Sequence, residues 1–345
     1  YSSPHLINFN ERIRINNICI TNNEIASFVE KKRKDIDEIK STFFETTTAM
    51  AFDHFSLKKI DIAVVETGLG GRLDATNVIN PIITAISSIS LDHRDMLGNN
   101  IVKIAKEKAG IIKRGIPVVI SPQKKSVRSI LFKTAAKFDS PIIQIKAASK
   151  VLYNKDGTSF DYKNISYNVP LIGKFQALNA LIAITIVKKL NKKINHQTIQ
   201  KGLAKTVWPG RLQRMSEFYP IYYDVAHNQE GICLMLETIK SLFSQKPIGL
   251  FVMKSDKELN LISDILKNKF DRLVISGGKQ FGLLNANELS KNLKYYNFDE
   301  FSTSNDFDIA LINIIELAKQ TKKPAIIFGS HYIAKPIFDK FGFYN

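Results

Sequence analysis

Short apolar runs alternate with helical stretches along most of this chain of 345 residues. Unbroken apolar runs of about four to eight residues indicate buried strands, whereas apolar residues spaced three and four apart indicate amphipathic helices. Strands that alternate with helices favour a parallel sheet of the α/β class. Residues 151–169 break this rhythm, because their polar and apolar side chains alternate around Asp156 and Gly157 and so predict antiparallel hairpins. The expected parallel strands cover residues 60–66, 82–90, 116–120, 141–145, 219–226, 247–253, 271–276 and 323–328.

A Trp-Pro-Gly sequence that begins at Trp208 marks a boundary between two domains. Pro and Gly interrupt regular structure, and a fresh alternation of strands and helices begins after them. The chain is also longer than one hydrophobic core usually serves. We therefore expect an N-terminal domain of residues 1–207 and a C-terminal domain of residues 208–345.

The formal net charge of +17 raises the question of a nucleic-acid partner, since Lys and Arg neutralise phosphates. The longest basic run, Lys31 to Lys34, is followed at once by the acidic sequence "DIDE", and the other lysines are scattered without interleaved aromatic residues. We expect no nucleic-acid partner, and we expect the positive field to attract small anionic substrates. No apolar run approaches the roughly 20 residues that span a bilayer, so we expect no membrane partner. Cys19 and Cys233 lie far apart in the sequence and outside any CxxC motif, which favours the cytoplasm.

Two of the expected strands end in side chains that suit catalysis. Glu66 ends the first and is followed by "GLGG", where the backbone can turn sharply and approach a ligand. The second ends in "SLDHRDMLG", which places Asp92 and His93 at the sheet edge where open α/β sheets bind ligands. Carboxylate and imidazole ligands near a phosphate suit Mg²⁺ or Mn²⁺. The residues alone leave open that Glu66 caps a helix and that His93 bonds a loop carbonyl.

One predicted helix, over residues 101–112, carries a charge on its apolar face. At about 100° per residue, Lys108 falls on the apolar stripe. A buried ammonium is costly unless it pairs, loses its proton or is modified. The alternative is that Lys108 reaches solvent along its own methylene groups. The other residues of the stripe are Ile101, Ile104, Ala105, Ile111 and Ile112.

Several motifs spread over essentially the whole chain carry a family resemblance. In chain order they are "YSSPHLINFNERI", "FFETTTAMAFDHF", "ETGLGGRLDATNV", "SLDHRDMLG", "EKAGIIK", "GKFQALNA", "WPGRLQ", "DVAHN" and "GSHYIA". Together they resemble the folylpolyglutamate synthase and dihydrofolate synthase family, a branch of the Mur-ligase superfamily. The resemblance implies a Mur-ligase-like α/β fold, with an N-terminal P-loop-type ATPase domain and a C-terminal Rossmann-like domain.

The phosphate-binding loop of this family is a glycine-rich loop with a lysine, upstream of the segment that matches "SSPH". No G-x-x-x-x-G-K-[ST] sequence occurs in the 345 residues, and "SGGKQFG" at Ser276 to Gly282 has the wrong spacing. We therefore expect an N-terminally truncated chain, with the first strand and the P-loop absent, and we expect it to be inactive as it stands. Phe175 and Arg94 also depart from residues that are frequent in the family, histidine and threonine.

The resemblance implies that the cofactors are ATP and one or two Mg²⁺ ions. It implies metal ligation by Ser3, Glu66 and His93. It also implies a carbamylated Lys108, which would turn a costly buried cation into an anion that faces the metal. This modification would account for the charge on the apolar stripe of residues 101–112.

The remaining roles implied by the resemblance fall into three groups. The contacts to adenosine and phosphate are assigned to Asn179, Arg211 and Asp224. The contacts to the pteroate are assigned to Thr42, Phe43, Phe44, Glu45, Leu73, Asp74 and Ala75. The incoming glutamate is assigned to His227, a catalytic candidate together with Lys108, and to Ser330, a substrate-binding candidate.

The implied reaction is the ATP-dependent ligation of L-glutamate to dihydropteroate or to a folate through an acyl phosphate. The implied partners are small molecules, namely dihydropteroate, tetrahydrofolate and L-glutamate, and the implied assembly is a monomer. Two alternatives stay open from the residues: a related Mur-type ligase with another acceptor, and a non-catalytic protein that kept the fold. The motifs do not distinguish the synthesis of dihydrofolate from the polyglutamylation of folates.

Overall fold

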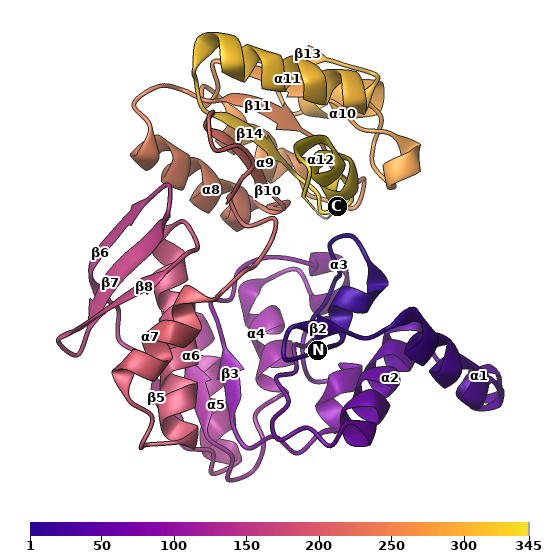
Figure 1. Ribbon diagram of the computed structural model, residues 1–345, viewed down its shortest axis with the longest axis vertical. Coiled ribbons are helices and arrows are strands. Elements are labelled where there is room, and N and C mark those ends of the chain that lie inside the picture. The colour runs from indigo at the N-terminus through magenta and orange to yellow at the C-terminus, as the bar shows by residue number, and fades with distance from the viewer. Residues whose placement is uncertain (344–345) are drawn as a thin grey trace. The chain divides into compact units, whose positions relative to one another are not determined.

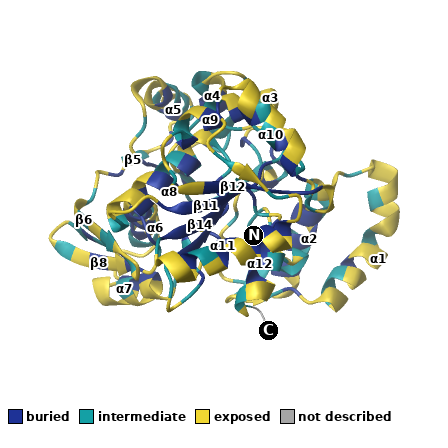
Figure 2. Cartoon of the chain, turned by 90° about the horizontal axis from the view of Figure 1, so that it is seen from above, coloured by how far each residue is buried: buried dark blue, intermediate teal, exposed yellow. Residues whose placement is uncertain are grey.

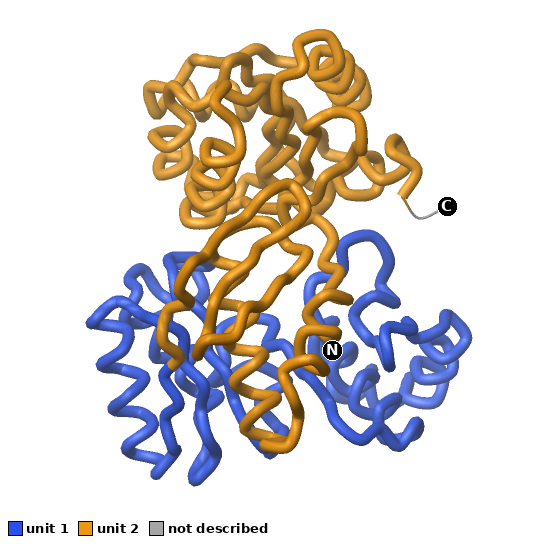
Figure 3. The backbone as a smooth tube through the Cα atoms, turned by 60° about the vertical axis from the view of Figure 1, so that its left-hand side comes forward, with its two compact units in different colours: residues 1–144 blue, residues 145–345 orange. Residues whose placement is uncertain are grey.

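The computed structural model describes residues 1–343, which fall into two compact units. Unit 1 ends at Gln144 and unit 2 begins at Ile145 (Figure 3). The boundary predicted near Trp208 lies inside unit 2 and stays a prediction. Within unit 2, Tyr153 of the hairpin region packs against the hydrophobic core that contains Tyr222, which ties the hairpins to the C-terminal strands.

Unit 1 is built around a three-stranded parallel sheet in the order β3-β4-β5. Side chains of β3 and β4 pack with α4 and α5 in one core, as Ile86, Val118, Ile104 and Leu131 illustrate. The elements of unit 1 are η1 Phe9–Arg12, β1 Arg14–Ile15, β2 Ile18–Cys19, α1 Asn22–Ile39, α2 Phe43–Leu57, η2 Ala75–Val78, β3 Thr84–Ile86, α3 Arg94–Leu97, α4 Ile101–Ala109, β4 Val118–Ile120, α5 Lys125–Lys137 and β5 Ile142–Gln144.

The strand predicted over residues 60–66 is wrong for the described structure. Residues 62–67 have no regular secondary structure, although the Tyr1 ammonium donates to the Val64 carbonyl (2.8 Å) and the Glu66 N–H donates to the Tyr1 carbonyl (3.0 Å). The side chain of Val64 is 82% exposed. A strand needs a neighbouring ladder along its length, and two hydrogen bonds to one residue do not supply it.

Unit 2 begins with the predicted antiparallel hairpins, which are confirmed as a separate sheet in the order β6-β7-β8 (Figure 1). The elements of unit 2 are β6 Ser149–Asn154, β7 Gly157–Tyr162, β8 Ile165–Val169, α6 Lys174–Leu190, α7 His196–Ala204, β9 Gln213–Arg214, β10 Ile221–Asp224, α8 Gln229–Leu242, β11 Ile248–Phe251, α9 Leu259–Leu266, β12 Arg272–Ile275, η3 Lys279–Phe281, α10 Ala286–Tyr295, β13 Ser302–Thr303, α11 Phe307–Thr321, β14 Ala325–Phe328 and α12 Ala334–Phe341.

The main sheet of unit 2 has the order β13-β12-β11-β14-β10-β9, and only the β9 pairing is antiparallel. Successive side chains of a strand point to opposite faces of the sheet, and helices pack against the side chains of both faces. Tyr222 joins the core that includes residues of α8, α9 and α10, whereas the ring of Tyr223 packs on Phe338 of α12. The central strands are buried throughout, as Figure 2 shows for β11 and β14. Among residues 1–343, no helix is both long enough and apolar enough to span a bilayer.

Candidate functional site

The "GLGG" loop of unit 1 lies against the C-terminal end of α4. The Arg72 N–H donates to the Glu107 carbonyl (2.9 Å), and the guanidinium of Arg72 pairs with the Glu107 carboxylate at 3.1 Å. A Cβ on Gly71 would lie 2.8 Å from a methyl of Ile111, and one on Gly110 would overlap the Arg72 backbone. These glycines are therefore required by the packing of the loop on the helix, a reason that the sequence did not reveal.

Asp74 holds the same loop together from the inside. Its Oδ2 accepts hydrogen bonds from the N–H groups of Gly68 (2.9 Å) and Leu69 (2.8 Å), and its Oδ1 accepts from the N–H of Thr76 (3.0 Å). The Asp74 side chain is buried, whereas the neighbouring Leu73 is 79% exposed. The predicted substrate residues of this loop thus separate into an internal clamp, Asp74, and an exposed apolar side chain, Leu73.

Two of the predicted metal ligands lie side by side. The Ser3 N–H donates to Oε2 of Glu66 at 3.0 Å, so the N-terminal segment runs along the end of the segment that carries Glu66. The Ser3 hydroxyl oxygen is buried and has no hydrogen-bond partner among residues 1–343. A buried hydroxyl without a partner costs free energy, which a bound ligand or ion would recover.

Lys108 is half-buried on the inner side of α4, as its place on the apolar stripe predicts. Burial lowers the pKa of its ammonium, and the nearby carboxylates of Asp92, Asp74 and Glu66 act in the opposite direction. A lowered pKa increases the fraction of neutral amine, which is the form that reacts with carbon dioxide. The predicted candidates Lys108 and Glu66 therefore belong to one electrostatic cluster with two aspartates.

His93 is the N-cap residue of α3 and has a left-handed backbone conformation with φ of 49°. Its Nε2 lies 3.9 Å from Oδ1 of Asp92, and its side chain is exposed. Among residues 1–343, no group of three or more His, Cys, Asp and Glu side chains is placed to hold a metal ion. The Ser3 hydroxyl and the Glu66 carboxylate are oxygen donors of the kind that suit Mg²⁺, and the contact described for His93 is the one with Asp92.

The segment at the start of α2, predicted to contact substrate, divides into capping and surface residues. Thr42 and Glu45 form a capping box, in which the Thr42 N–H donates to Glu45 (2.7 Å) and the Glu45 N–H donates to Thr42 (3.2 Å). Phe44 packs under Gly68, where a Cβ would overlap its ring. Phe43 is 62% exposed and is the one of these four side chains that presents an apolar ring to solvent.

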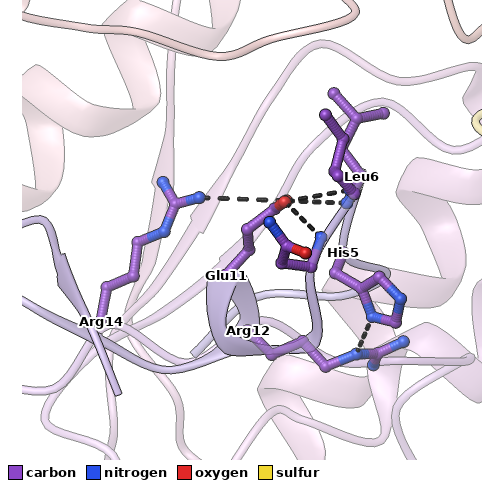
Figure 4. Close-up of polar contacts among 7 residues, drawn as sticks. His5, Leu6, Glu11, Arg12 and Arg14 are labelled. Carbon is purple, nitrogen blue, oxygen red and sulfur yellow. Dashed lines mark hydrogen bonds and ion pairs between the residues drawn. The ribbon is translucent and has the colours of Figure 1, made fainter. Parts of the chain in front are cut away.

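Arg12 supports the Phe43 ring, and the sequence did not identify it. Its guanidinium carbon lies 5.2 Å from the centre of the Phe43 ring. Its Nε donates to Nδ1 of His5 at 2.9 Å, as Figure 4 shows. Burial and the Arg12 charge lower the pKa of His5. Glu11 shapes this loop by accepting hydrogen bonds from three successive N–H groups, those of Leu6, Ile7 and Asn8. The only signal in the sequence was an arginine within the quoted motif "NERI".

In unit 2, the buried Asp224 holds the segment that carries Arg211. Its Oδ2 accepts a hydrogen bond from the Leu212 N–H and its Oδ1 accepts one from the Ala226 N–H, both at 2.7 Å. Arg211 is exposed, and its charge acts on Asp224. The carboxylate of Asp224, predicted to contact nucleotide, therefore accepts hydrogen bonds from backbone N–H groups. Arg211 is the residue of this pair that is exposed to solvent.

The other candidates of unit 2 lie at the ends of strands and helices. Nδ1 of His227 lies 2.9 Å from the Val225 carbonyl, which selects the tautomer that carries a proton on Nδ1. The Ser330 hydroxyl accepts from the Tyr332 N–H at 3.1 Å, so it shapes the turn after β14. Asn179 is exposed on α6 and donates to Gln176 at 3.1 Å. His227 and Ser330 both follow strands of the main sheet that pair with each other.

Comparison with known proteins places this chain among ligases. The family model for the Mur ligase middle domain matches residues 14–187. The chain is 34% identical to dihydrofolate synthase/folylpolyglutamate synthase of Bacillus subtilis (strain 168), over 98% of this chain and 82% of that protein. It is 33% identical to folylpolyglutamate synthase of Lacticaseibacillus casei, over 80% of this chain and 69% of that protein. Its structure resembles Mycobacterium tuberculosis folylpolyglutamate synthase complexed with ADP and AMPPCP, with a TM-score of 0.88 and 29% identity over 99% of this chain and 84% of that one.

Proposed function

The chain belongs to the folylpolyglutamate synthase and dihydrofolate synthase family, and we propose that it uses ATP to join L-glutamate to dihydropteroate, to the terminal glutamate of a folate, or to both. The observation that carries this proposal is the half-buried Lys108, which lies where the carboxylates of Glu66, Asp74 and Asp92 act on it. Titratable groups whose pKa is shifted by burial and by nearby charges often lie at functional sites. The fold supplies the α/β framework that such ligases share.

The reaction has two steps. The γ-phosphoryl group of ATP moves to the acceptor carboxylate, which yields ADP and an acyl phosphate. The neutral amine of glutamate then attacks the acyl carbon, loses its proton and expels phosphate. The exposed guanidinium of Arg211 is suited to stabilise charge on the phosphoryl group, and the buried Asp224 holds its segment in place.

Metal binding is proposed for Ser3, Glu66 and His93. The buried Ser3 hydroxyl without a protein partner and the adjacent Glu66 carboxylate fit a hard cation such as Mg²⁺. A bound Mg²⁺ would neutralise phosphate charge during transfer. His93 would join these ligands with one nitrogen, and its neighbour Asp92 would orient the ring.

We further propose that Lys108 carries a carbamate. The neutral amine would add to carbon dioxide and release one proton, so that an anion replaces a cation whose burial is unfavourable. Incubation with ¹³C-labelled bicarbonate should give a carbamate carbon signal that disappears in Lys108→Ala. Lys106→Ala, on the exposed side of the same helix, should keep the signal. A spectrum without a carbamate signal in the wild-type protein would reject the modification.

The acceptor is proposed to contact the exposed apolar side chains of Phe43 and Leu73. An aromatic pterin ring would stack on Phe43, whose ring also contacts the guanidinium of Arg12. Asp74 would act indirectly, because its carboxylate is used to close the loop that presents Leu73. Thr42 and Glu45 would likewise act by fixing the start of α2.

The test is an assay of the protein as the cell makes it, with ATP, L-glutamate and either dihydropteroate or tetrahydrofolate. We expect ADP release that depends on both other substrates, together with a product whose mass is larger by one glutamyl residue. Omission of the acceptor serves as the control. Ligation of glutamate to neither acceptor would reject the proposed substrates, and ligation of another acceptor would indicate a related Mur-type ligase. The cytoplasmic location and the monomeric state stay predictions.

A further inference from the structure

One stretch of unit 2, residues 162–216, is strongly basic. It contains ten Lys and Arg residues and no Asp or Glu, whereas the whole chain has 49 Lys and Arg against 32 Asp and Glu. The basic run of α1 differs, because Lys32 pairs with Asp35 at 3.0 Å and Lys34 lies 3.7 Å from Glu38. The charge of residues 162–216 is therefore not balanced by acidic residues of the same stretch.

Four of these lysines lie where α6 ends and the turn towards α7 begins. Lys188 and Lys189 belong to the last turn of α6, and Lys192 and Lys193 follow it. Lys188 is half-buried and the other three are exposed, and within residues 1–343 none of the four forms an ion pair. Leu190, between the two pairs of lysines, is 40% exposed. We call the four lysine side chains and Leu190 the lysine surface.

Helix electrostatics account for only half of the lysine surface. Cations in the last turn of a helix are stabilised by the partial negative charge of its terminal carbonyl groups, which suits Lys188 and Lys189. Lys192 and Lys193 lie beyond the end of α6 and shortly before α7, whose N-terminal end carries a partial positive charge. Like charges this close in the chain repel one another, and an anionic partner would relieve the repulsion.

The side chains of this region favour one kind of anionic partner. Residues 188–196 contain no Arg, Phe, Tyr or Trp, the side chains that bind phosphates in a bidentate way or stack on bases. Lysines around an exposed apolar side chain are instead typical of proteins that bind the surface of an anionic membrane.

We propose that the lysine surface docks the protein on an anionic lipid bilayer, with its ammonium groups against the lipid phosphates and Leu190 among the headgroups. Docking of this kind needs no spanning segment. The expectation of no membrane partner was based on the lack of a spanning segment, so it does not exclude this contact. The inference is independent of the proposed ligase activity.

Cosedimentation of the full chain with vesicles tests the proposal. The protein should bind vesicles of phosphatidylglycerol and phosphatidylcholine in equal parts, and high salt should release it. The double variant Lys192→Ala/Lys193→Ala should bind about 25-fold more weakly, because each lysine near an anionic surface contributes about 5-fold. Lys192→Arg/Lys193→Arg should bind like the wild type, since it keeps the charge. The matched control, Lys31→Ala/Lys34→Ala, removes the same charge from α1 and should change binding less than 2-fold.

Equal thermal unfolding midpoints would show that the variants fold, as expected for exposed positions in a turn. Wild-type protein that stays in solution with the anionic vesicles would overturn the proposal, and so would equal binding by Lys192→Ala/Lys193→Ala. Equal binding to vesicles of phosphatidylcholine alone would also overturn it, because those vesicles carry no net charge. Tighter binding to a single-stranded oligouridylate than to the anionic vesicles, at the same salt concentration, would assign the lysine surface to nucleic acid instead.

Discussion

Asp224 and Leu212 are joined by a buried hydrogen bond that fastens the segment carrying Arg211 to the end of β10. The Leu212 N–H donates to Oδ2 of Asp224 at 2.7 Å, and the Ala226 N–H donates to the other oxygen at the same distance. Burial raises the pKa of Asp224, while the charge of Arg211 and the two N–H groups act in the opposite direction. The carboxylate thus has a structural role in addition to any contact with nucleotide.

Asp224→Asn should lower the free energy of unfolding by about 2 kcal/mol at pH 7, because the amide has one acceptor oxygen where the carboxylate has two. The folded pKa lies above that of the unfolded chain, so folding takes up a proton between the two values. Ionisation of Asp224 therefore lowers the stability of the wild-type protein as the pH rises through this window, and the loss on Asp224→Asn at pH 7 is what the two N–H hydrogen bonds contribute after that decrease. Urea unfolding as a function of pH measures both effects. Asp299→Asn, at an exposed position, is the control, and equal stability of the two variants would contradict the role of Asp224.

Gly110→Ala should lower the free energy of unfolding by about 1 to 3 kcal/mol, because the new methyl group would overlap the backbone of Arg72 and push the loop away from α4. Turnover should fall as well, since the same loop carries Leu73. Gly202→Ala, on α7, meets nothing within 4 Å and should raise stability by about 0.5 to 1 kcal/mol. The comparison of the two variants in urea unfolding checks this prediction, which fails if both change stability in the same direction.

Glu66→Gln should reduce turnover at limiting Mg²⁺ by about 100-fold, because the amide still accepts the hydrogen bond from Ser3 but has no charge for the cation. His93→Ala should raise the Mg²⁺ concentration that gives half-maximal rate. Both variants should unfold at wild-type temperatures, since the affected side chains are exposed. His196→Ala, an exposed histidine of α7, provides the control. A wild-type dependence of rate on Mg²⁺ would remove Glu66 and His93 from the metal site.

Glu24→Gln should lower the free energy of unfolding by about 1 kcal/mol at pH 7. A hydrogen bond from Lys58, at 2.8 Å, and hydrogen bonds from Thr21 lower the pKa of Glu24 to about 2. Its stabilising effect is therefore complete above the ordinary pKa of a glutamate and is lost as the pH falls towards 2. Solvent screening of this exposed pair limits the size of the effect. The difference between wild type and variant should shrink on acidification, and Glu38→Gln, an exposed partner of Lys34, should show a smaller difference throughout.

The local pattern of the chain was enough for most of the fold. Apolar runs at 116–120, 247–253 and 323–328 correspond to β4, β11 and β14, because a strand buried on both faces needs apolar side chains at every position. The alternation in 151–169 likewise predicts the three hairpin strands correctly. The run at 60–66 has an equally apolar pattern, yet the described structure has no ladder beside it, and pairing is a property that no single segment contains.

The candidate site, like the fold, was predicted only in part from the sequence. The place of Lys108 on the apolar stripe of its helix follows from 3.6-residue periodicity, which is local. By contrast, the family resemblance assigns Asp74 and Asp224 to ligand contacts. In the folded chain their carboxylates accept hydrogen bonds from backbone N–H groups. Lys254 and Tyr332 are far apart in the sequence and meet because β11 and β14 are neighbours in the sheet. Periodicity determined which residues are buried, whereas the pairing of distant strands decided which polar groups meet, because hydrogen bonds and ion pairs depend on positions in space that the order of residues does not specify.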